Sequence, residues 1–217
     1  MIKNNLYLNE KKIKVIDNFL QEKDLKEILE IALKKDAKNE FNVYHNEINE
    51  SGIITSSIEP SLISRLHKNY HSKAFSILKE INKEKAELYD YSDFTIIITG
   101  KNSKFPIHDD TPNKLLSGVI YLYPEKNFGT FFYDNNKGKN KLDAEWQVNR
   151  GVFFSRKERE TWHSYHSDGV NNRVALVYNL MTKRIKEVYK IEKKNYFLGM
   201  LRWKMNPYLF RYFKFYF

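Results

Sequence analysis

The stretch "FPIHDDTPN", residues 105–113, places a histidine and two aspartates shortly after the apolar run "FTIIITG", residues 94–100. Acidic side chains are among the least often buried, so His-x-Asp at the end of a predicted strand is unusual for packing. Residues two apart in a strand project to the same side, which puts His108 and Asp110 together and Asp109 opposite. Imidazole and carboxylate groups in this arrangement are typical metal ligands, and a third ligand has to come from elsewhere in the chain.

Short segments rich in β-branched and aromatic residues surround this motif. They are "DFTIIIT", "SGVIYLY", "GTFFY", "QVNRGVFFS" and "NRVALVYNL", with Gly, Asn, Asp and Pro between them. Such spacing predicts antiparallel strands forming a β-sandwich or barrel between about residues 90 and 181. Alternation along the last segment places Arg173, Ala175, Val177 and Asn179 on one side, facing a cavity.

Helical spacing of apolar residues marks the part of the chain before these strands. One amphipathic helix is predicted over Leu20 to Lys35, and a second begins at Pro60 and buries a face that ends at Ile81. Residues 41–58 show no clear pattern. The expected organisation is a single domain, 1–217, with an N-terminal helical region (1–88), a β core (89–181) and a basic, aromatic C-terminal extension (182–217).

Composition limits the class of protein. The 217 residues are 41% hydrophobic and 15% aromatic, which is typical of a globular chain. The absence of cysteine excludes disulfides and thiolate metal sites and is compatible with a reducing compartment. No segment resembles a signal peptide or approaches the length of a membrane span. We therefore expect a cytoplasmic protein, with membrane association through its C-terminal extension as an addition to that expectation.

The net charge of +10 is concentrated near the C-terminus. Residues 181–217 contain ten Lys and Arg and two Glu, so the rest of the chain is close to neutral. Residues 196–217 contain ten aromatic side chains, four Lys or Arg and no acidic residue. This segment either packs on the core or a second subunit, or it lies at a membrane surface. Pro207 is expected to divide it into two short helices.

The six histidines differ in their surroundings. His45 stands alone and is expected at the surface. His67 and His71 share a helical face, but Lys68 stands where a zinc protease motif would have glutamate, so no metal site is predicted there. In "TWHSYHS", His163 and His166 are three apart and face opposite sides of a strand, so only one of them can point inward. Two histidines and one carboxylate with open positions are the signature of non-haem Fe(II) oxygenases.

In these residues the chain resembles the 2-oxoglutarate and Fe(II)-dependent oxygenase superfamily, in particular its prolyl-hydroxylase-like branch. His108-Asp109-Asp110 resembles the family's His-x-Asp, "SGVIYLYPEKNFGT" its following strand and turn, and Gly100 a family glycine. His163 follows His108 by 55 residues, and Arg173 follows His163 by ten, an offset at which the family places a basic residue. That offset and the strand parity favour His163 over His166 as the distal ligand.

The resemblance implies a double-stranded β-helix, a jelly-roll or cupin-like core with helices packed on it. It implies that His108, Asp110 and His163 hold Fe(II), and that Arg173 binds the far carboxylate of the cosubstrate 2-oxoglutarate. Thr99 and Ala175 stand where many relatives have tyrosine and serine hydroxyls. Thr99 could still donate one hydrogen bond to that carboxylate, and Tyr121 could substitute for the other.

The implied reaction consumes dioxygen, hydroxylates a substrate and releases succinate and carbon dioxide, with ascorbate as a further candidate reductant. The substrate is left open among small molecules, glycans, lipids and protein side chains. Nucleic acid is disfavoured, because the demethylases of the superfamily carry a second arginine where this chain has Asn179. The alternatives are a non-catalytic β-barrel that binds a ligand or partner, and a membrane-surface docking protein that acts through its tail. The oligomeric state is not predicted.

Neighbouring residues have alternative roles. Asp109 is expected to be solvated or to cap a turn. Trp162 is expected in the core, and Tyr165 on the same side as His163, where it could line the cavity. The polar loop from Asp134 to Asp143 is either a lid over the site or a long surface hairpin.

Overall fold

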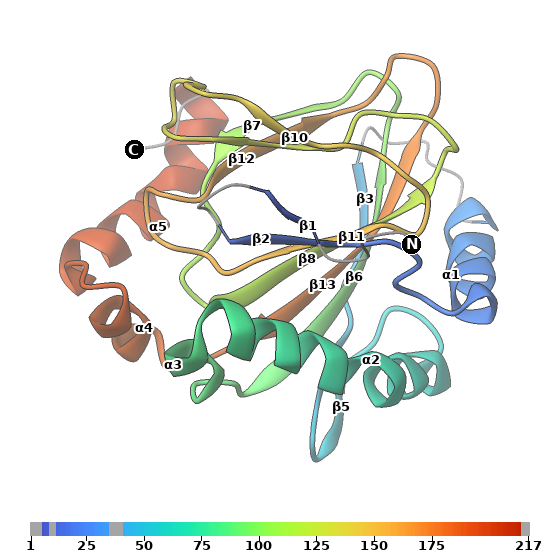
Figure 1. Ribbon diagram of the computed structural model, residues 1–217, viewed down its shortest axis with the longest axis horizontal. Helices are drawn as coiled ribbons and strands as arrows, with labels where there is room; N and C mark the ends of the chain where they lie inside the picture. The colour runs from blue at the N-terminus through green and yellow to red at the C-terminus, as the bar shows by residue number, and fades with distance from the viewer. Residues whose placement is uncertain (1–5, 9–11, 35–40, 214–217) are drawn as a thin grey trace.

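The computed structural model describes residues 6–8, 12–34 and 41–213. Two antiparallel sheets lie face to face, with helices on the outer side of the larger sheet and at one end of both (Figure 1). The smaller sheet has the order β10-β9-β12-β7. The larger sheet has the order β1-β2-β11-β8-β13-β6-β4-β5, with β3 also paired to β6. The predicted jelly-roll core is confirmed as an open two-sheet sandwich, and the strands of the described residues do not close the two sheets into one barrel.

The strands of the larger sheet are β1 (Leu6–Leu8), β2 (Ile13–Ile16), β3 (Phe41–Tyr44), β4 (Glu47–Asn49), β5 (Gly52–Thr55), β6 (Tyr91–Thr99), β8 (Lys114–Tyr123), β11 (Gly151–Phe154) and β13 (Arg173–Met181). Those of the smaller sheet are β7 (Lys104–His108), β9 (Thr130–Tyr133), β10 (Leu142–Ala144) and β12 (Trp162–His166). The helices are α1 (Glu22–Lys34), α2 (Pro60–Ile81), α3 (Lys83–Ala86), α4 (Ile185–Ile191) and α5 (Tyr196–Phe213).

The central strand β13 shows how the sequence pattern builds the two layers. Its alternate residues Val174, Leu176 and Tyr178 belong to the main hydrophobic core beneath α1 and α2. Of the intervening residues, Arg173, Ala175 and Asn179 are also buried and Val177 is partly buried, on the face toward the smaller sheet. The alternation predicted for this strand is therefore correct, and it places the Arg173 side chain between the two sheets.

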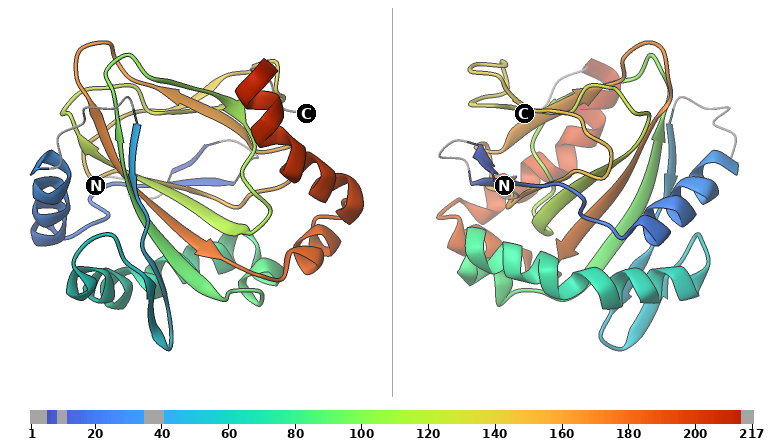
Figure 2. Two further views of the ribbon diagram at one scale, coloured as in Figure 1. Left: turned by 180° about the vertical axis from the view of Figure 1, so that it is seen from behind. Right: turned by 45° about the vertical axis from the view of Figure 1, so that its right-hand side comes forward.

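Helices α1 and α2 cover the outer face of the larger sheet (Figure 2). Helix α2 begins at Pro60 as predicted and buries eight residues at helical spacing: Leu62, Ile63, Leu66, Tyr70, Ala74, Ile77, Leu78 and Ile81. Helix α1 agrees with the helix predicted over 20–35 to within two residues at its start, and Lys35 lies outside the described residues. Burial of these apolar faces is the main stabilising contribution of the helices.

The region expected to be helical, 1–88, also contributes strands. Strand β2 followed by α1 agrees with the strand-then-helix opening implied by the resemblance to the oxygenase family, whereas β1, β3, β4 and β5 were not predicted. These strands are three or four residues long and lie toward the edges of the sheet, so their sequences carry no sustained alternation to detect. The segment 134–143 links β9 to β10, which pair with each other, so it is the surface hairpin of the two alternatives.

The C-terminal extension folds differently from the prediction. Pro207 was expected to divide the segment, but α5 is one helix with Pro207 inside it. A proline inside a helix removes one backbone hydrogen bond, and its ring clashes with the carbonyl group of the preceding turn. On its inner side, α5 contacts the body of the protein at Gly199, which lies against Tyr189, and through the ion pair of Arg202 with Glu158. Within the described part of the chain, no helix is long and apolar enough to cross a membrane.

Candidate metal centre and its cavity

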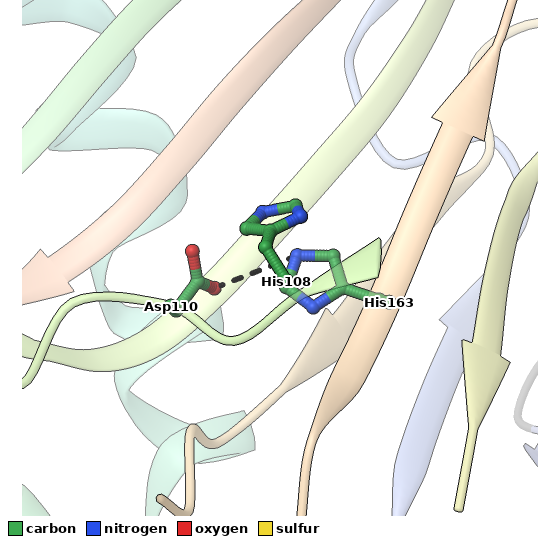
Figure 3. A group of neighbouring side chains, drawn as sticks. All are labelled: His108, Asp110 and His163. Atoms are coloured by element: carbon green, nitrogen blue, oxygen red, sulfur yellow. Dashed lines mark ion pairs between the residues drawn. The ribbon is translucent and has the colours of Figure 1, made fainter. Parts of the chain in front are cut away.

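Three side chains from the smaller sheet and its loops converge between the two sheets. His108 ends β7, Asp110 follows two residues later, and His163 lies on β12 in register with His108. His163 Nε2 lies 3.9 Å from an Asp110 carboxylate oxygen, and the two imidazole ring centres are 4.2 Å apart (Figure 3). One ligand atom from each residue lies within 4.8 Å of the others, a spacing that suits a shared metal ion.

Backbone carbonyls fix the tautomers of both histidines. His108 Nδ1 lies 3.0 Å from the carbonyl oxygen of Pro106, and His163 Nδ1 lies 2.9 Å from that of Thr161. A carbonyl oxygen only accepts, so each Nδ1 carries the proton and each Nε2 is left as a ligand. Burial lowers the pKa of His163, and burial together with His163 lowers the pKa of His108 to about 3. Both rings are therefore neutral near pH 7, which is the form that binds metals.

Asp110 is held as a carboxylate by its neighbours. One oxygen accepts a hydrogen bond from Ser117 Oγ at 2.5 Å, and the other accepts from Lys114 Nζ at 2.7 Å. Burial by itself raises the pKa of Asp110, but Lys114 and the two imidazoles more than offset this and lower it below its usual value. Lys114 and Ser117 were not identified from the sequence, because a single lysine and a single serine in a strand carry no periodic signal.

Asp109 points away from this cluster and organises the loop before β12. Its carboxylate accepts hydrogen bonds from the Arg159 backbone N–H and from Thr161 Oγ1, both at 2.7 Å. Burial raises the pKa of Asp109 to about 6. The capping role predicted for Asp109 is confirmed. Trp162 next to this loop is buried as predicted, against Phe131 and Tyr133.

A buried ionic network supports the same loops from behind. Glu192, at the end of α4, pairs with Lys85 Nζ at 2.6 Å and with Arg156 Nη1 at 2.7 Å. Arg156 Nε then donates to the backbone carbonyl of Asp110 at 3.1 Å. The three charged side chains are almost fully buried, so each depends on the others for compensation. Lys85, Arg156 and Glu192 are far apart in the sequence, so no sequence pattern predicts that they form ion pairs.

A second polar position lies deeper between the sheets. Arg173 is 2% exposed, and its Nε and Nη2 atoms have no hydrogen-bond partner among the described residues. Its guanidinium carbon lies 4.5 Å from the ring centre of Tyr165, 5.1 Å from that of Trp146 and 5.6 Å from that of Tyr121. Burial lowers the pKa of Arg173, which reflects the cost of holding an uncompensated charge there. The position is suited to an anion that would enter from the cluster side.

Two aromatic rings connect this arginine to the cluster. The Tyr165 ring stacks on Phe105 at 5.3 Å, and the Phe105 ring packs edge-on against His108 at 4.5 Å. Tyr165 therefore lines the space between Arg173 and the cluster, the position predicted for it. Trp146, in the loop before β11, was not identified from the sequence.

A cavity of about 510 Å³ opens on the other side of the cluster. The loop after β7, the loop before β12 and the inner side of α5 form its walls. Residues that line it are Phe105, His108, Asp109, Asp110, Thr111, Pro112, Lys114, Arg156, Glu158, Arg159, Trp162, Tyr189, Gly199, Arg202, Trp203, Asn206 and Pro207. This volume is within the range of small-ligand sites.

Comparison with solved structures shows which known fold this chain shares. A prolyl-4-hydroxylase from Pseudomonas putida is 14% identical, with a TM-score of 0.54 over 80% of this chain and 94% of the other. The viral collagen prolyl hydroxylase of Paramecium bursaria Chlorella virus-1, solved with 2-oxoglutarate, is 13% identical, with a TM-score of 0.55 over 81% and 98%. A 2-oxoglutarate-Fe(II) oxygenase family protein from Burkholderia pseudomallei is 15% identical, with a TM-score of 0.56 over 80% and 86%.

The chain has the prolyl-hydroxylase-like fold of the 2-oxoglutarate/Fe(II) oxygenases. No protein-family model matches its sequence. No curated protein matches it significantly. The resemblance seen in the sequence is thus confirmed at the level of the fold, through the order and pairing of the strands.

Within this oxygenase fold, the two hydroxyls predicted to assist Arg173 have different surroundings. Thr99 lies directly opposite Arg173 in the β6–β13 pairing, and its buried Oγ1 faces the Tyr165 hydroxyl beside the guanidinium. The Tyr121 hydroxyl accepts from Thr130 N at 2.8 Å and lies 2.9 Å from Thr130 Oγ1 and 3.0 Å from the Ala144 carbonyl. Tyr121 therefore ties β8 to β9 and β10 through its hydroxyl and offers Arg173 only its ring. Its predicted hydrogen bond to the cosubstrate is replaced by this structural role.

Because the two hydroxyls have different roles, substitution of Tyr121 is expected to affect stability, and substitution of Thr99 is expected to affect 2-oxoglutarate binding. Tyr121→Phe is expected to lower the free energy of unfolding by about 1–3 kcal/mol, because it leaves the buried Thr130 N–H without an acceptor. Thr99→Val is expected to leave stability unchanged but to raise the 2-oxoglutarate requirement roughly two- to tenfold, the effect of one lost hydrogen bond. Urea denaturation and 2-oxoglutarate titration measure the two effects. The reverse pattern would show that the roles of the two hydroxyls are exchanged.

The other histidines lie away from the cluster. The His166 ring contacts Phe128 and Phe131 at 4.5 and 5.1 Å, on the opposite side of β12 from His163, as strand parity predicted. His45 is exposed, as predicted, and contacts Thr95 Oγ1. His67 and His71 are half-buried and stack on each other at 4.6 Å, and burial lowers the pKa of both. Among the described residues, only His108, Asp110 and His163 form a group able to hold a metal ion.

Proposed function

We propose that the protein is a 2-oxoglutarate- and Fe(II)-dependent dioxygenase that hydroxylates a substrate entering the 510 Å³ cavity. The observation that carries this proposal is the buried, unpaired guanidinium of Arg173 on the inner side of the His108–Asp110–His163 cluster. A buried cation without an anion is costly, so its position is best explained by a ligand that supplies the missing charge.

The cluster residues have the properties that an Fe(II) site requires. Two neutral imidazole Nε2 atoms and one carboxylate form a set that leaves coordination positions open. Carbonyl hydrogen bonds orient both rings, and Ser117 and Lys114 orient the carboxylate, so the ligands are pre-organised before a metal enters. Fe(II) bound there would supply the activation of dioxygen, and the protein residues would supply position and exclusion of water.

The residues around Arg173 fit the distal carboxylate of 2-oxoglutarate. The guanidinium offers two free donor atoms, and a carboxylate accepts such a pair with matching geometry. Thr99 Oγ1 offers a third donor beside it. The rings of Tyr165, Trp146 and Tyr121 exclude water from the slot, which strengthens the charge pairing. The second carboxylate and the keto group of the cosubstrate would then lie toward the cluster.

The cavity beyond the cluster would hold the substrate. Its walls include the aromatic side chains Phe105, Trp162 and Trp203, and its volume suits a small molecule or one side chain of a protein, glycan or lipid. A nucleic-acid substrate is disfavoured further by Asn179, which is buried and donates to Asp93 Oδ2 at 2.8 Å. The experiment that tests the function is oxygen-dependent conversion of 2-oxoglutarate to succinate and carbon dioxide by the Fe(II)-loaded chain.

A further inference from the structure

Helix α5 presents an apolar stripe on the side facing away from the body of the protein. Phe197 is 79% exposed, Tyr208 is 67% exposed and Tyr212 is 67% exposed. The stripe, which we name the outer face of α5, comprises Phe197, Leu198, Leu201, Met205, Tyr208 and Tyr212. Steps of three and four residues connect most of these positions, so they lie on one side of the helix. An exposed group of large apolar side chains on one helix marks an interaction surface.

The orientation of α5 is set by its other side. Gly199, Arg202, Trp203 and Asn206 line the cavity beside the metal cluster. A side chain at position 199 would overlap the Tyr189 ring, so the glycine allows α5 to lie close to α4. Arg202 Nη1 pairs with Glu158 Oε1 at 3.1 Å. These contacts fix which side of α5 faces inward, and they leave the apolar stripe exposed on the other side.

The charged residues of α5 all have one sign. Lys204 and Arg211 are exposed on α5, and Lys193 is exposed just before it. Neither Lys204 nor Arg211 makes an ion pair with any residue in the described part of the chain. Helix α5 contains no acidic residue. A second copy of the chain seated symmetrically on this face would bring these cations together without compensating carboxylates, which is unfavourable.

We propose that the outer face of α5 docks on an anionic membrane surface. Phe, Tyr and Leu side chains would enter the region between headgroups and acyl chains, and Lys204 and Arg211 would contact anionic headgroups. Because the opposite side of the same helix forms a wall of the cavity, docking would hold that cavity at the membrane surface. The docking surface rests on the exposure and charge of α5 and does not depend on the proposed reaction.

Vesicle co-sedimentation of the full-length protein tests this surface. The probes are vesicles of phosphatidylcholine and phosphatidylserine in equal parts, and vesicles of phosphatidylcholine alone. Binding is expected only to the former, and it should weaken as salt is raised. The double variant Lys204→Glu/Arg211→Glu is expected to lower the partition coefficient roughly tenfold or more. Leu201→Ser/Tyr208→Ser should lower it similarly without changing the melting temperature, because both side chains are exposed.

Matched controls come from α1. Leu33 is 58% exposed and Lys23 is exposed, so Leu33→Ser and Lys23→Glu make the same chemical changes away from α5 and should leave vesicle binding unchanged. Absence of binding to the phosphatidylserine vesicles would overturn the proposal, as would equal losses in the α1 and α5 variants. Concentration-dependent dimerisation that Leu201→Ser/Tyr208→Ser abolishes would overturn it in favour of a second copy of the chain.

Discussion

Replacing His163 with alanine is expected to abolish Fe(II) binding and succinate formation, whereas replacing His166 should leave both within about twofold of wild type. His163 supplies one of three ligand atoms that converge between the sheets. Even the loss of a residue that merely orients a ligand weakens metal binding about 10–100-fold, so the loss of a ligand should cost at least the upper end of this range. The His166 ring contacts Phe128 and Phe131 on the opposite side of β12 from His163, so it does not contact the cluster.

Anaerobic Fe(II) titration followed by calorimetry measures the first effect, and succinate formation measures the second. His108→Ala and Asp110→Ala should behave like His163→Ala. Circular dichroism and the melting temperature of the metal-free variants establish that each still folds. Wild-type iron affinity in His163→Ala, or its loss in His166→Ala, would show that the ligand assignment is wrong.

Replacing Arg173 with methionine is expected to raise the dissociation constant of 2-oxoglutarate roughly ten- to hundredfold while leaving the metal-free protein as stable as wild type, or more stable. A hydrogen-bonded pair with a charged group contributes about 1.5–3 kcal/mol, which sets the loss of affinity. Stability should not fall, because methionine occupies a similar volume and removes a buried charge that has no acidic partner among the described residues. The stabilisation of wild type by saturating 2-oxoglutarate should also be lost.

Arg156 is the matched control, because it is equally buried but paired with Glu192 at 2.7 Å. Arg156→Met leaves part of the buried Glu192 charge uncompensated and is expected to cost roughly 3–5 kcal/mol in the free energy of unfolding. Thermal denaturation with and without 2-oxoglutarate, at fixed Fe(II), compares the two variants. If Arg173→Met destabilised the protein as strongly as Arg156→Met and bound 2-oxoglutarate normally, Arg173 would be a structural residue.

Much of the fold was accessible from the sequence because it depends on local periodicity. The alternation along β13 and the 3.6-residue spacing in α2 both report which face is buried, and both predictions agree with the structure. The pairing of His108 with His163 followed from strand parity and from a resemblance carried by residue order. The short strands β1, β3, β4 and β5 were missed, since three or four residues cannot establish a period.

The remaining features depend on contacts between distant parts of the chain. Pro207 lies inside a helix that the Arg202–Glu158 ion pair joins to the body of the protein, and a local preference cannot anticipate such a contact. The sequence does not show which group the Tyr121 hydroxyl contacts. In the structure it forms hydrogen bonds with Thr130 and Ala144, which are distant in the chain from each other and lie on neighbouring strands. Glu192 and Lys85 are 107 residues apart, and no sequence pattern links them.

Oxygen-dependent succinate formation tests the central claim most directly. The Fe(II)-loaded protein is mixed anaerobically with isotopically labelled 2-oxoglutarate and an undialysed cell lysate, which retains small molecules as well as macromolecules as sources of substrate, and oxygen is then admitted. We predict that succinate and carbon dioxide appear in equal amounts, that neither forms without oxygen, and that Asp110→Ala forms neither. No succinate from wild-type protein that binds both Fe(II) and 2-oxoglutarate, or equal amounts from wild type and Asp110→Ala, would contradict the proposed reaction and favour a non-catalytic ligand-binding protein.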